Sequence, residues 1–257
     1  MPILRNPDID RSAGHAAALR FLTHFAYRAY CRAKRINGPY GPITPNATYS
    51  PWLADSGFLK VYEKIKSHTM VNILMCYGLW SMVEQCAKLS EGALMEIGVW
   101  RGGTGGLIAK AAELNGIKEN VYLCDNFEGL VKAGSKDWFF KGGELKDTSE
   151  ALVSDLVHKK LGLKNVRLLK GIFPDQTAHL VTDARFRFCH IDVVLYESGR
   201  DIVSWIWDKM VVGGVLVFDD YGFRHCSGIT NLVNERKHHD DAFYIYNLCG
   251  HGILIKR

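Results

Sequence analysis

The feature that most constrains the fold is a regular alternation of short apolar runs with helical segments, which begins at residue 93. The runs have strand length, whereas the segments between them repeat their apolar residues at helical spacing. Such alternation is typical of right-handed βαβ units, so it predicts an α/β fold with a mostly parallel sheet and helices on both faces. We expect strands at 93–98, 121–124, 166–169, 187–192 and 213–218, with helices at 103–115, 148–161, 199–209 and 227–238.

The last apolar runs, 243–248 and 251–255, flank a Gly-His-Gly region and predict a terminal hairpin. With it, the sheet would have seven strands. Ahead of the alternation, a helix at 69–89 carries a buried apolar stripe, which places the domain boundary between residues 68 and 69. The chain is thus expected to contain an N-terminal extension, 1–68, and a main domain, 69–257.

The extension combines a basic amphipathic helix with an irregular loop. The helix is expected at 15–35, and its basic stripe consists of Arg20, His24, Arg28, Arg32 and Arg35. Such a helix can lie on a membrane surface, join a second copy of the chain, or pack on its own protein. The loop at 37–57 is rich in proline and glycine and can act as a lid, with Tyr40, Tyr49 and Trp52 stacking on a ligand. Ordinary packing of these aromatics fits equally well.

Charge and hydropathy exclude two classes of partner for the main domain. The net charge is +5, but residues 1–40 hold seven basic and two acidic side chains, so the rest is neutral. Nucleic-acid binding by the main domain therefore has no electrostatic support. The longest apolar run, 211–218, is far shorter than the ~20 residues that a membrane-spanning helix needs.

The N-terminus and the cysteines favour a cytoplasmic location. The first residues lack the apolar core of a secretory signal. The seven cysteines are odd in number and scattered, without zinc-ligand spacing, so we expect reduced thiols.

A glycine-rich turn follows the first expected strand and points to a nucleoside-binding site. The turn runs from Glu96 to Gly106, and a helix follows it. Glycines let a ligand approach the backbone, and the helix start exposes amide groups. Asp125 ends the next strand, 22 residues after Gly103, where Rossmann-like sites hold ribose hydroxyls. Tight helix packing and a helix N-cap are the alternatives for these features.

The spacing of the glycines in this turn helps to distinguish between the nucleoside-containing ligands that it could bind. The pattern E-x-G-x-x-x-G-G is longer than the G-x-G-x-x-G of dinucleotide enzymes, and no Gly-Lys-Ser/Thr follows, which disfavours an NTPase. The leading acid, Glu96, would repel a pyrophosphate but can bind an amine-bearing ligand. This favours S-adenosylmethionine over NAD; an NAD-linked oxidoreductase is the rival enzyme.

Two more expected strands end in acids at the same sheet edge. Asp192 ends one strand, and Asp219 and Asp220 end the other. Carboxylates that converge there would repel each other without a cation, and oxygen ligands select hard ions such as Mg²⁺ or Mn²⁺. A helix cap at Asp192 and a solvated turn at 219–220 are the alternative.

The ordered set of motifs resembles the metal-dependent macrocin and novobiocin O-methyltransferases, which methylate hydroxyls of antibiotics and other glycosides. The resemblance covers roughly residues 50–240. It rests on Thr69-Met70-Val71, EIGVWRGGT (96–104), DNFEGL (125–130), KGIFPD (170–175), HIDVVLYES (190–198) and GGVLVFDDYG (213–222).

The resemblance implies a class I methyltransferase fold, S-adenosylmethionine as methyl donor and a divalent metal. It places the metal at Asp192, Asp219 and Asp220. It also implies a small hydroxylated acceptor, without indicating which one. The donor-binding positions that it implies are Thr69, Glu96, Gly98, Trp100, Arg101, Gly102, Thr104, Asp125, Phe127, Gly171, Phe173 and Asp192.

One departure from the family pattern concerns the general base. Family members commonly carry a second Asp in the motif at 192–198, where this chain has Val194. His225 is the best substitute, because an imidazole can accept a proton near neutral pH; Tyr196 and His190 are weaker candidates. We therefore assign catalysis to Asp192 and His225. A homologue that binds the donor without transferring methyl is the alternative.

Overall fold

A computed structural model describes residues 18, 21–22, 25–33, 40 and 49–257. The chain divides into two units, Met1–Tyr49 and Ser50–Arg257. In the first unit, residues 25–33 are helical, which agrees with the expected basic helix over that stretch. Most of its basic stripe and most of the predicted lid loop lie outside the described residues.

The second unit is built on one sheet of seven strands. Five parallel strands are followed by β7, which pairs antiparallel with both β5 and β6, in the order β3-β2-β1-β4-β5-β7-β6. The strands are β1 (Ala93–Ile97), β2 (Val121–Asp125), β3 (Val166–Lys170), β4 (Phe186–Ile191), β5 (Met210–Phe218), β6 (Ala242–Tyr246) and β7 (Gly252–Lys256). The predicted mostly parallel sheet and its terminal hairpin are confirmed.

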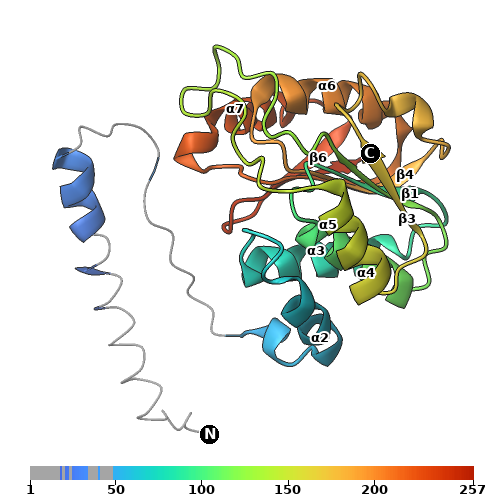
Figure 1. Cartoon of the computed structure of the whole chain (residues 1–257). Coiled ribbons are helices and arrows are strands. Elements are labelled where there is room, and N and C mark those ends of the chain that lie inside the picture. Colours follow the sequence, from blue (N-terminus) through green and yellow to red (C-terminus); the bar gives the residue numbers. More distant parts are fainter. Residues whose placement is uncertain (1–17, 19–20, 23–24, 34–39, 41–48) are drawn as a thin grey trace, which may run out of the picture. The chain divides into compact units, whose positions relative to one another are not determined.

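Helices cover both faces of this sheet (Figure 1). One face packs against α2, α3, α4, α5 and the π-helical turn η2, and the other against α6 and α7. Because the central strands are buried on both sides, they read as almost continuous apolar runs. The helices are α2 (Ser56–Ile65), α3 (Ile73–Cys86), α4 (Gly103–Leu114), α5 (Glu150–Ser154), η2 (Asp155–Lys160), α6 (Tyr196–Ile206) and α7 (Ser227–Arg236).

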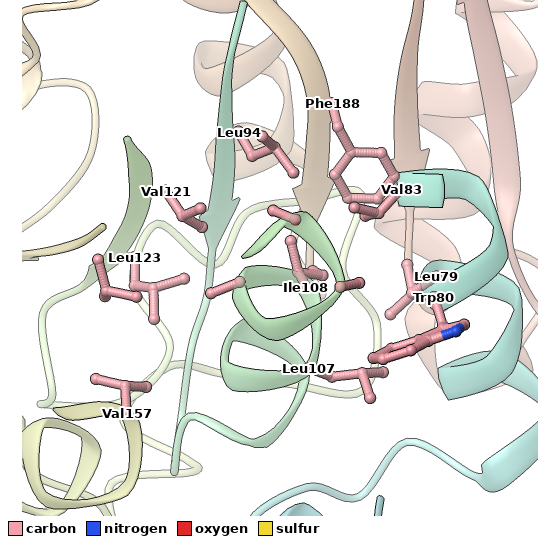
Figure 2. Packing of buried hydrophobic residues seen from close by; sticks show 14 of the residues in the cluster. Leu79, Trp80, Val83, Leu94, Leu107, Ile108, Val121, Leu123, Val157 and Phe188 are labelled. Atoms are coloured by element: carbon pink, nitrogen blue, oxygen red, sulfur yellow. The ribbon is translucent and has the colours of Figure 1, made fainter. Parts of the chain in front are cut away.

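The core beneath α3 and α4 holds the glycine turn in place. Leu107 and Ile108 of α4 belong to one buried cluster with the strand residues Leu94 and Val121 and the α3 residue Val83 (Figure 2). All five side chains are fully buried. Burying a side chain of this kind stabilises the fold by roughly 1.5–3 kcal/mol, so the start of α4 is firmly anchored.

Helix α2 is the main element that the sequence analysis did not predict. Its start is capped by Asp55, whose carboxylate accepts a hydrogen bond from the Phe58 amide at 2.8 Å. Phe58, Val61 and Ile65 are buried at helical spacing. As a result, the compact unit begins at Ser50, upstream of the expected boundary at 68/69.

The start of the second unit also bears on the predicted lid aromatics. Trp52 is half-buried and packs edge-on against Tyr77 of α3, with ring centroids 6.2 Å apart. Tyr49, by contrast, is exposed.

Among the described helices, none has the length and apolar character that crossing a membrane requires.

Candidate active site

A cavity of about 460 Å³ lies at the carboxyl ends of β1, β2, β4 and β5. Open α/β sheets bind their ligands at this edge. Most of the predicted site residues line this one cavity, although they come from distant parts of the chain. They are Thr69, Gly98, Trp100, Thr104, Asp125, Gly171, Phe173, Asp192, Asp219, Asp220 and His225.

Gly98 allows two neighbouring strands to end close together. Its φ is +86°, and a Cβ atom there would lie 1.9 Å from the backbone carbonyl oxygen of Asp192. No side chain fits in that space, so a glycine is required. The turn after β1 can therefore lie directly beside the end of β4.

Asp125 fixes the conformation of the glycine turn. Its Oδ2 accepts hydrogen bonds from the amides of Val99 and Trp100 at 2.7 and 2.8 Å, and its Oδ1 accepts one from the Phe127 amide at 2.7 Å. Trp100 adopts a φ of +46°, which these bonds help to maintain. A carboxylate can accept about four hydrogen bonds, so Asp125 retains capacity toward a ligand in the cavity.

Glu96, a predicted donor-binding residue, does not line the cavity. It is fully buried, and its Oε1 lies 2.8 Å from Nδ1 of His190. Its Oε2 faces Gly105, where an added Cβ would lie only 2.5 Å from that oxygen. Glu96 therefore packs behind the cavity wall, between His190 and Gly105, and does not face the cavity.

Three other predicted donor-binding residues also lie off the cavity wall. Gly102 is the N-cap residue immediately before α4, and Phe127 is buried in the core on the α3 and α4 side. The Arg101 guanidinium forms an ion pair with Asp147 at 2.7 Å. These residues belong to the loops that carry the cavity wall.

The structure brings the three predicted metal ligands together. Asp192 follows β4, Asp219 and Asp220 follow β5, and one carboxylate oxygen of each lies within 4.8 Å of the others. Burial, together with the charges of Asp219 and Asp220, raises the pKa of Asp192 well above its usual range. Burial and Asp219 also raise the pKa of Asp220 to about 7. Bringing all three charges together is therefore unfavourable unless a cation offsets them, and such an all-oxygen set fits a hard divalent ion.

Two buried histidines contact Asp219 from behind. The Nε2 atoms of His251 and His190 lie 2.9 and 3.7 Å from Asp219 Oδ1. Neither contact has hydrogen-bond geometry, so within the described chain this oxygen has no hydrogen-bond partner. Burial alone would raise the pKa of Asp219, but the two histidines lower it to about 2. Burial likewise opposes protonation of His190, but Asp219 and Glu96 raise its pKa to about 10.

The candidate bases differ in how they are placed. Val194 is buried, lines the cavity and has a φ of +64°. His225 also lines the cavity, and its ring lies 5.8 and 5.9 Å from those of Phe139 and Phe140. The Tyr196 hydroxyl donates to Glu235 at 2.7 Å and is already engaged.

His251 is one of the site residues that the sequence analysis missed. It immediately precedes β7, whose Gly252 pairs with Phe218 of β5, so it comes to lie beside Asp219. The Gly-His-Gly sequence was visible as a break between two apolar runs. That His251 lies beside Asp219 depends on the pairing of β5 with β7, and this pairing cannot be predicted from the local sequence.

Comparison with known proteins identifies relatives of this chain. A family model described as macrocin-O-methyltransferase (TylF) matches residues 65–249. The chain is 28% identical over 170 residues to the 8-demethyl-8-(2,3-dimethoxy-alpha-L-rhamnosyl)-tetracenomycin-C 4'-O-methyltransferase of Streptomyces olivaceus, over 62% of this chain and 65% of that protein. It is 29% identical over 181 residues to the demethyldecarbamoylnovobiocin O-methyltransferase of Streptomyces niveus, over 66% of this chain and 67% of that protein. The matched region thus spans about two thirds of each relative.

Solved structures share the fold. The O-methyltransferase NovP matches with a TM-score of 0.63 and 25% identity, over 74% of this chain and 82% of that one. The calicheamicin methyltransferase CalS11 matches with a TM-score of 0.58 and 14% identity, over 85% and 99% of the two chains. The predicted class I methyltransferase fold is confirmed.

Proposed function

The chain belongs to the macrocin-O-methyltransferase family, and from this premise we propose that it is an S-adenosylmethionine-dependent, divalent-metal-assisted O-methyltransferase. The acceptor is a hydroxyl of a sugar, a glycoside or another natural-product small molecule. One observation carries the proposal: the turn organised by Asp125 and the converging carboxylates of Asp192, Asp219 and Asp220 line the same cavity. Methyl transfer needs donor and acceptor in direct contact, and one cavity with both features can provide it.

The donor half of the cavity has the chemistry that an adenosyl group requires. Asp125 already accepts three amide hydrogen bonds, so it has room for about one more, from a ribose hydroxyl. Gly98 lets the ligand approach the backbone, and the buried Phe173 supplies an apolar wall. In this proposal Thr69, Trp100, Thr104 and Gly171 complete the donor wall, whereas Glu96 and Arg101 support it from outside.

The acceptor half is defined by Asp192, Asp219 and Asp220, which would hold Mg²⁺ or Mn²⁺ through carboxylate oxygens. When bound, such an ion lowers the pKa of a hydroxyl and neutralises developing negative charge. The carboxylates orient the acceptor relative to the donor, and the surrounding apolar side chains exclude water. His190 and His251 lie behind Asp219, where they restrict its movement.

The acceptor proton needs a destination, and Val194 cannot receive it. We assign this role to His225, which lines the same cavity. It lies on the short turn Arg224–Cys226, a few residues after the Asp219-Asp220 pair, so we place it in the acceptor half. An imidazole there can accept the proton as the hydroxyl oxygen attacks the methyl group.

Val194 also favours a second candidate function. A family member that lacks the usual carboxylate could bind S-adenosylmethionine and an acceptor without transferring methyl. This alternative keeps the donor half intact and differs only in turnover.

Turnover measurements separate the two functions. The full chain would be incubated with S-adenosylmethionine, Mg²⁺ and a panel of aryl glycosides that carry vicinal hydroxyls, and S-adenosylhomocysteine and methylated product would be followed by mass spectrometry. The proposal predicts both products in equal amounts, and their loss in Asp219→Asn. Donor binding without either product would instead favour the non-catalytic alternative.

A further inference from the structure

A second hollow, of about 340 Å³, adjoins the proposed acceptor half of the cavity. Two of its lining residues, Phe140 and His225, also line the main cavity, so the two spaces share a wall. No residue assigned above to the donor or the metal lines it. We call this hollow the aryl subsite; its lining residues are Trp138, Phe139, Phe140, Arg224 and His225.

The aromatic rings of the aryl subsite form a continuous apolar surface. Trp138 and Phe139 meet edge to face with centroids 5.5 Å apart, and Phe139 and Phe140 do so at 5.0 Å. Trp138 and Phe139 nevertheless remain 54% and 53% exposed. Large aromatic side chains left half-exposed around a concavity are characteristic of a binding surface.

Polar contacts of Asp137 and Trp138 hold this surface in place. Asp137 is 7% exposed, and its carboxylate accepts hydrogen bonds from the backbone amides of Gly134 and Tyr196 at 3.0 and 3.1 Å. The Trp138 indole donates to the carbonyl oxygen of Arg224 at 2.9 Å. The loop is thus fastened both to α6 and to the turn before α7, and a preorganised surface of this kind loses little entropy on binding.

Among the residues that line the aryl subsite, Arg224 carries the permanent positive charge, beside three aromatic rings and the His225 imidazole. Its guanidinium lies 5.7 Å from the Trp138 ring centre, and within the described part of the chain it makes no ion pair or side-chain hydrogen bond. A single cation above aromatic rings suits an electron-rich ring or one acidic substituent. A diphosphate, which carries more charge, would call for additional cations or a cluster of amides.

We propose that the aryl subsite binds a planar, unsaturated part of the acceptor that does not react, while the acceptor hydroxyl lies at the carboxylates. The inference rests on the proposed function and narrows its substrate class. The acceptor is then an aryl or polycyclic glycoside, or a similar conjugated molecule, and neither a free monosaccharide nor a nucleoside diphosphate sugar. Trp138 and Phe139 are the specificity-determining residues.

The test compares three probes with the same sugar, 2-naphthyl β-D-glucoside, methyl β-D-glucoside and UDP-glucose, by ligand-observed NMR titration of the full chain. Each is titrated with Mg²⁺, with and without S-adenosylhomocysteine. The variants are Trp138→Ala and Phe139→Ala, with Phe243→Ala as matched control, since Phe243 is 60% exposed on β6. Because all three side chains are more than half exposed, the variants should fold.

We expect the naphthyl glucoside to bind more tightly than the methyl glucoside. Removing one stacking ring should weaken naphthyl binding about fivefold, whereas Phe243→Ala should have no effect. Equal binding of the two glucosides, or UDP-glucose as the probe most sensitive to Trp138→Ala, would overturn the proposal. The S-adenosylhomocysteine titration reports separately on the donor site, so a failure of the proposed methyltransferase function is distinguishable from a failure of the aryl subsite.

Discussion

Val194 adopts a backbone conformation that suits a different kind of residue. A φ of +64° is tolerated by Gly, Asn and Asp but is strained for a β-branched side chain. The cost is on the order of 1–2 kcal/mol. The loop after β4 therefore has a backbone shape that an Asp would adopt at position 194 with less strain than the Val194 that is present.

Restoring the carboxylate should change catalysis. If the proton leaves by an inefficient route in the present chain, Val194→Asp should raise the methyl-transfer rate, because positioned general bases contribute on the order of 10²-fold or more. The measurement is the initial rate of S-adenosylhomocysteine formation at saturating donor.

Val194→Asn is the matched control for this prediction. It should relieve the same backbone strain and raise the unfolding free energy by about 1 kcal/mol, without supplying a base. An equal rate increase in both variants would show that strain, and not proton transfer, limits the reaction. No increase in Val194→Asp would contradict the prediction and show that the route through His225 does not limit the rate.

The residues that could be predicted are those whose position follows from a strand end. Asp125 ends a parallel strand, and Asp192 and Asp219 directly follow one, so their meeting at one edge follows from topology. The role of Glu96 could not be predicted in the same way. It lies within β1, and only the packing of Gly105 and His190 around it shows that it faces away from the cavity.

Strand β7 contributes to the site although it runs opposite to the strands that carry the acids. Its pairing with β5 places His251 beside Asp219, with Nε2 2.9 Å from the carboxylate. Side chains that restrain a metal ligand typically affect metal affinity by 10–100-fold when they are removed.

We therefore expect His251→Ala to weaken Mn²⁺ binding by at least tenfold. The affinity can be measured by electron paramagnetic resonance of free Mn²⁺, which does not require turnover. His239→Ala, at an exposed position, should bind Mn²⁺ like the unaltered chain. An unchanged affinity in His251→Ala would show that β7 has no part in metal binding.

The turn after β5 should also make stability depend on pH. Burial and Asp219 raise the pKa of Asp220 to about 7 in the folded protein, above the unfolded value of ~3.9. The folded state then holds this proton more tightly, so its stabilising contribution is complete below the unfolded pKa and is lost as pH rises through about 7.

Thermal unfolding without metal tests this expectation. Raising the pH from 5 to 8 should lower the Tm more in the unaltered chain than in Asp220→Asn, which cannot ionise. Mg²⁺ should recover much of the loss at pH 8, since a ligand that binds only the folded state stabilises it. A pH dependence identical in both proteins would refute the assigned environment of Asp220.

Helix α2 shows why one element escaped prediction. Its ten residues follow a segment rich in proline and glycine, which favoured a loop up to residue 57. The signals were present, namely the capping Asp55 and the apolar spacing of Phe58, Val61 and Ile65. These signals indicate a helix of the main unit only once α2 is known to pack into the core with α3 and α4.

At the scale of the whole molecule, the sheet order and the cavity belong to the unit Ser50–Arg257. The expected alternation of strands and helices sufficed to predict that architecture, because each βαβ unit has one favoured hand. The boundary with the N-terminal unit was harder to predict from the sequence, since it depends on where α2 packs.

Two truncations locate the boundary. A chain of residues 50–257 should keep the Tm within a few degrees, because every residue that lines the main cavity lies downstream of position 67. A chain of residues 69–257 loses three buried side chains of α2, each worth roughly 1.5–3 kcal/mol, and should be severely destabilised. Equal stability of the two truncated chains would place the boundary at 68/69 after all.

Titration calorimetry of the full chain with S-adenosylmethionine tests the central claim most directly. The titration would be done with Mg²⁺ and again after chelation, and repeated with Asp125→Ala. We predict micromolar binding in both conditions, because of the proposed metal ligands only Asp192 is also a donor-binding position, and a marked loss of affinity in Asp125→Ala. Absence of binding to the unaltered chain in both conditions would contradict the assignment of this cavity to a methyl donor.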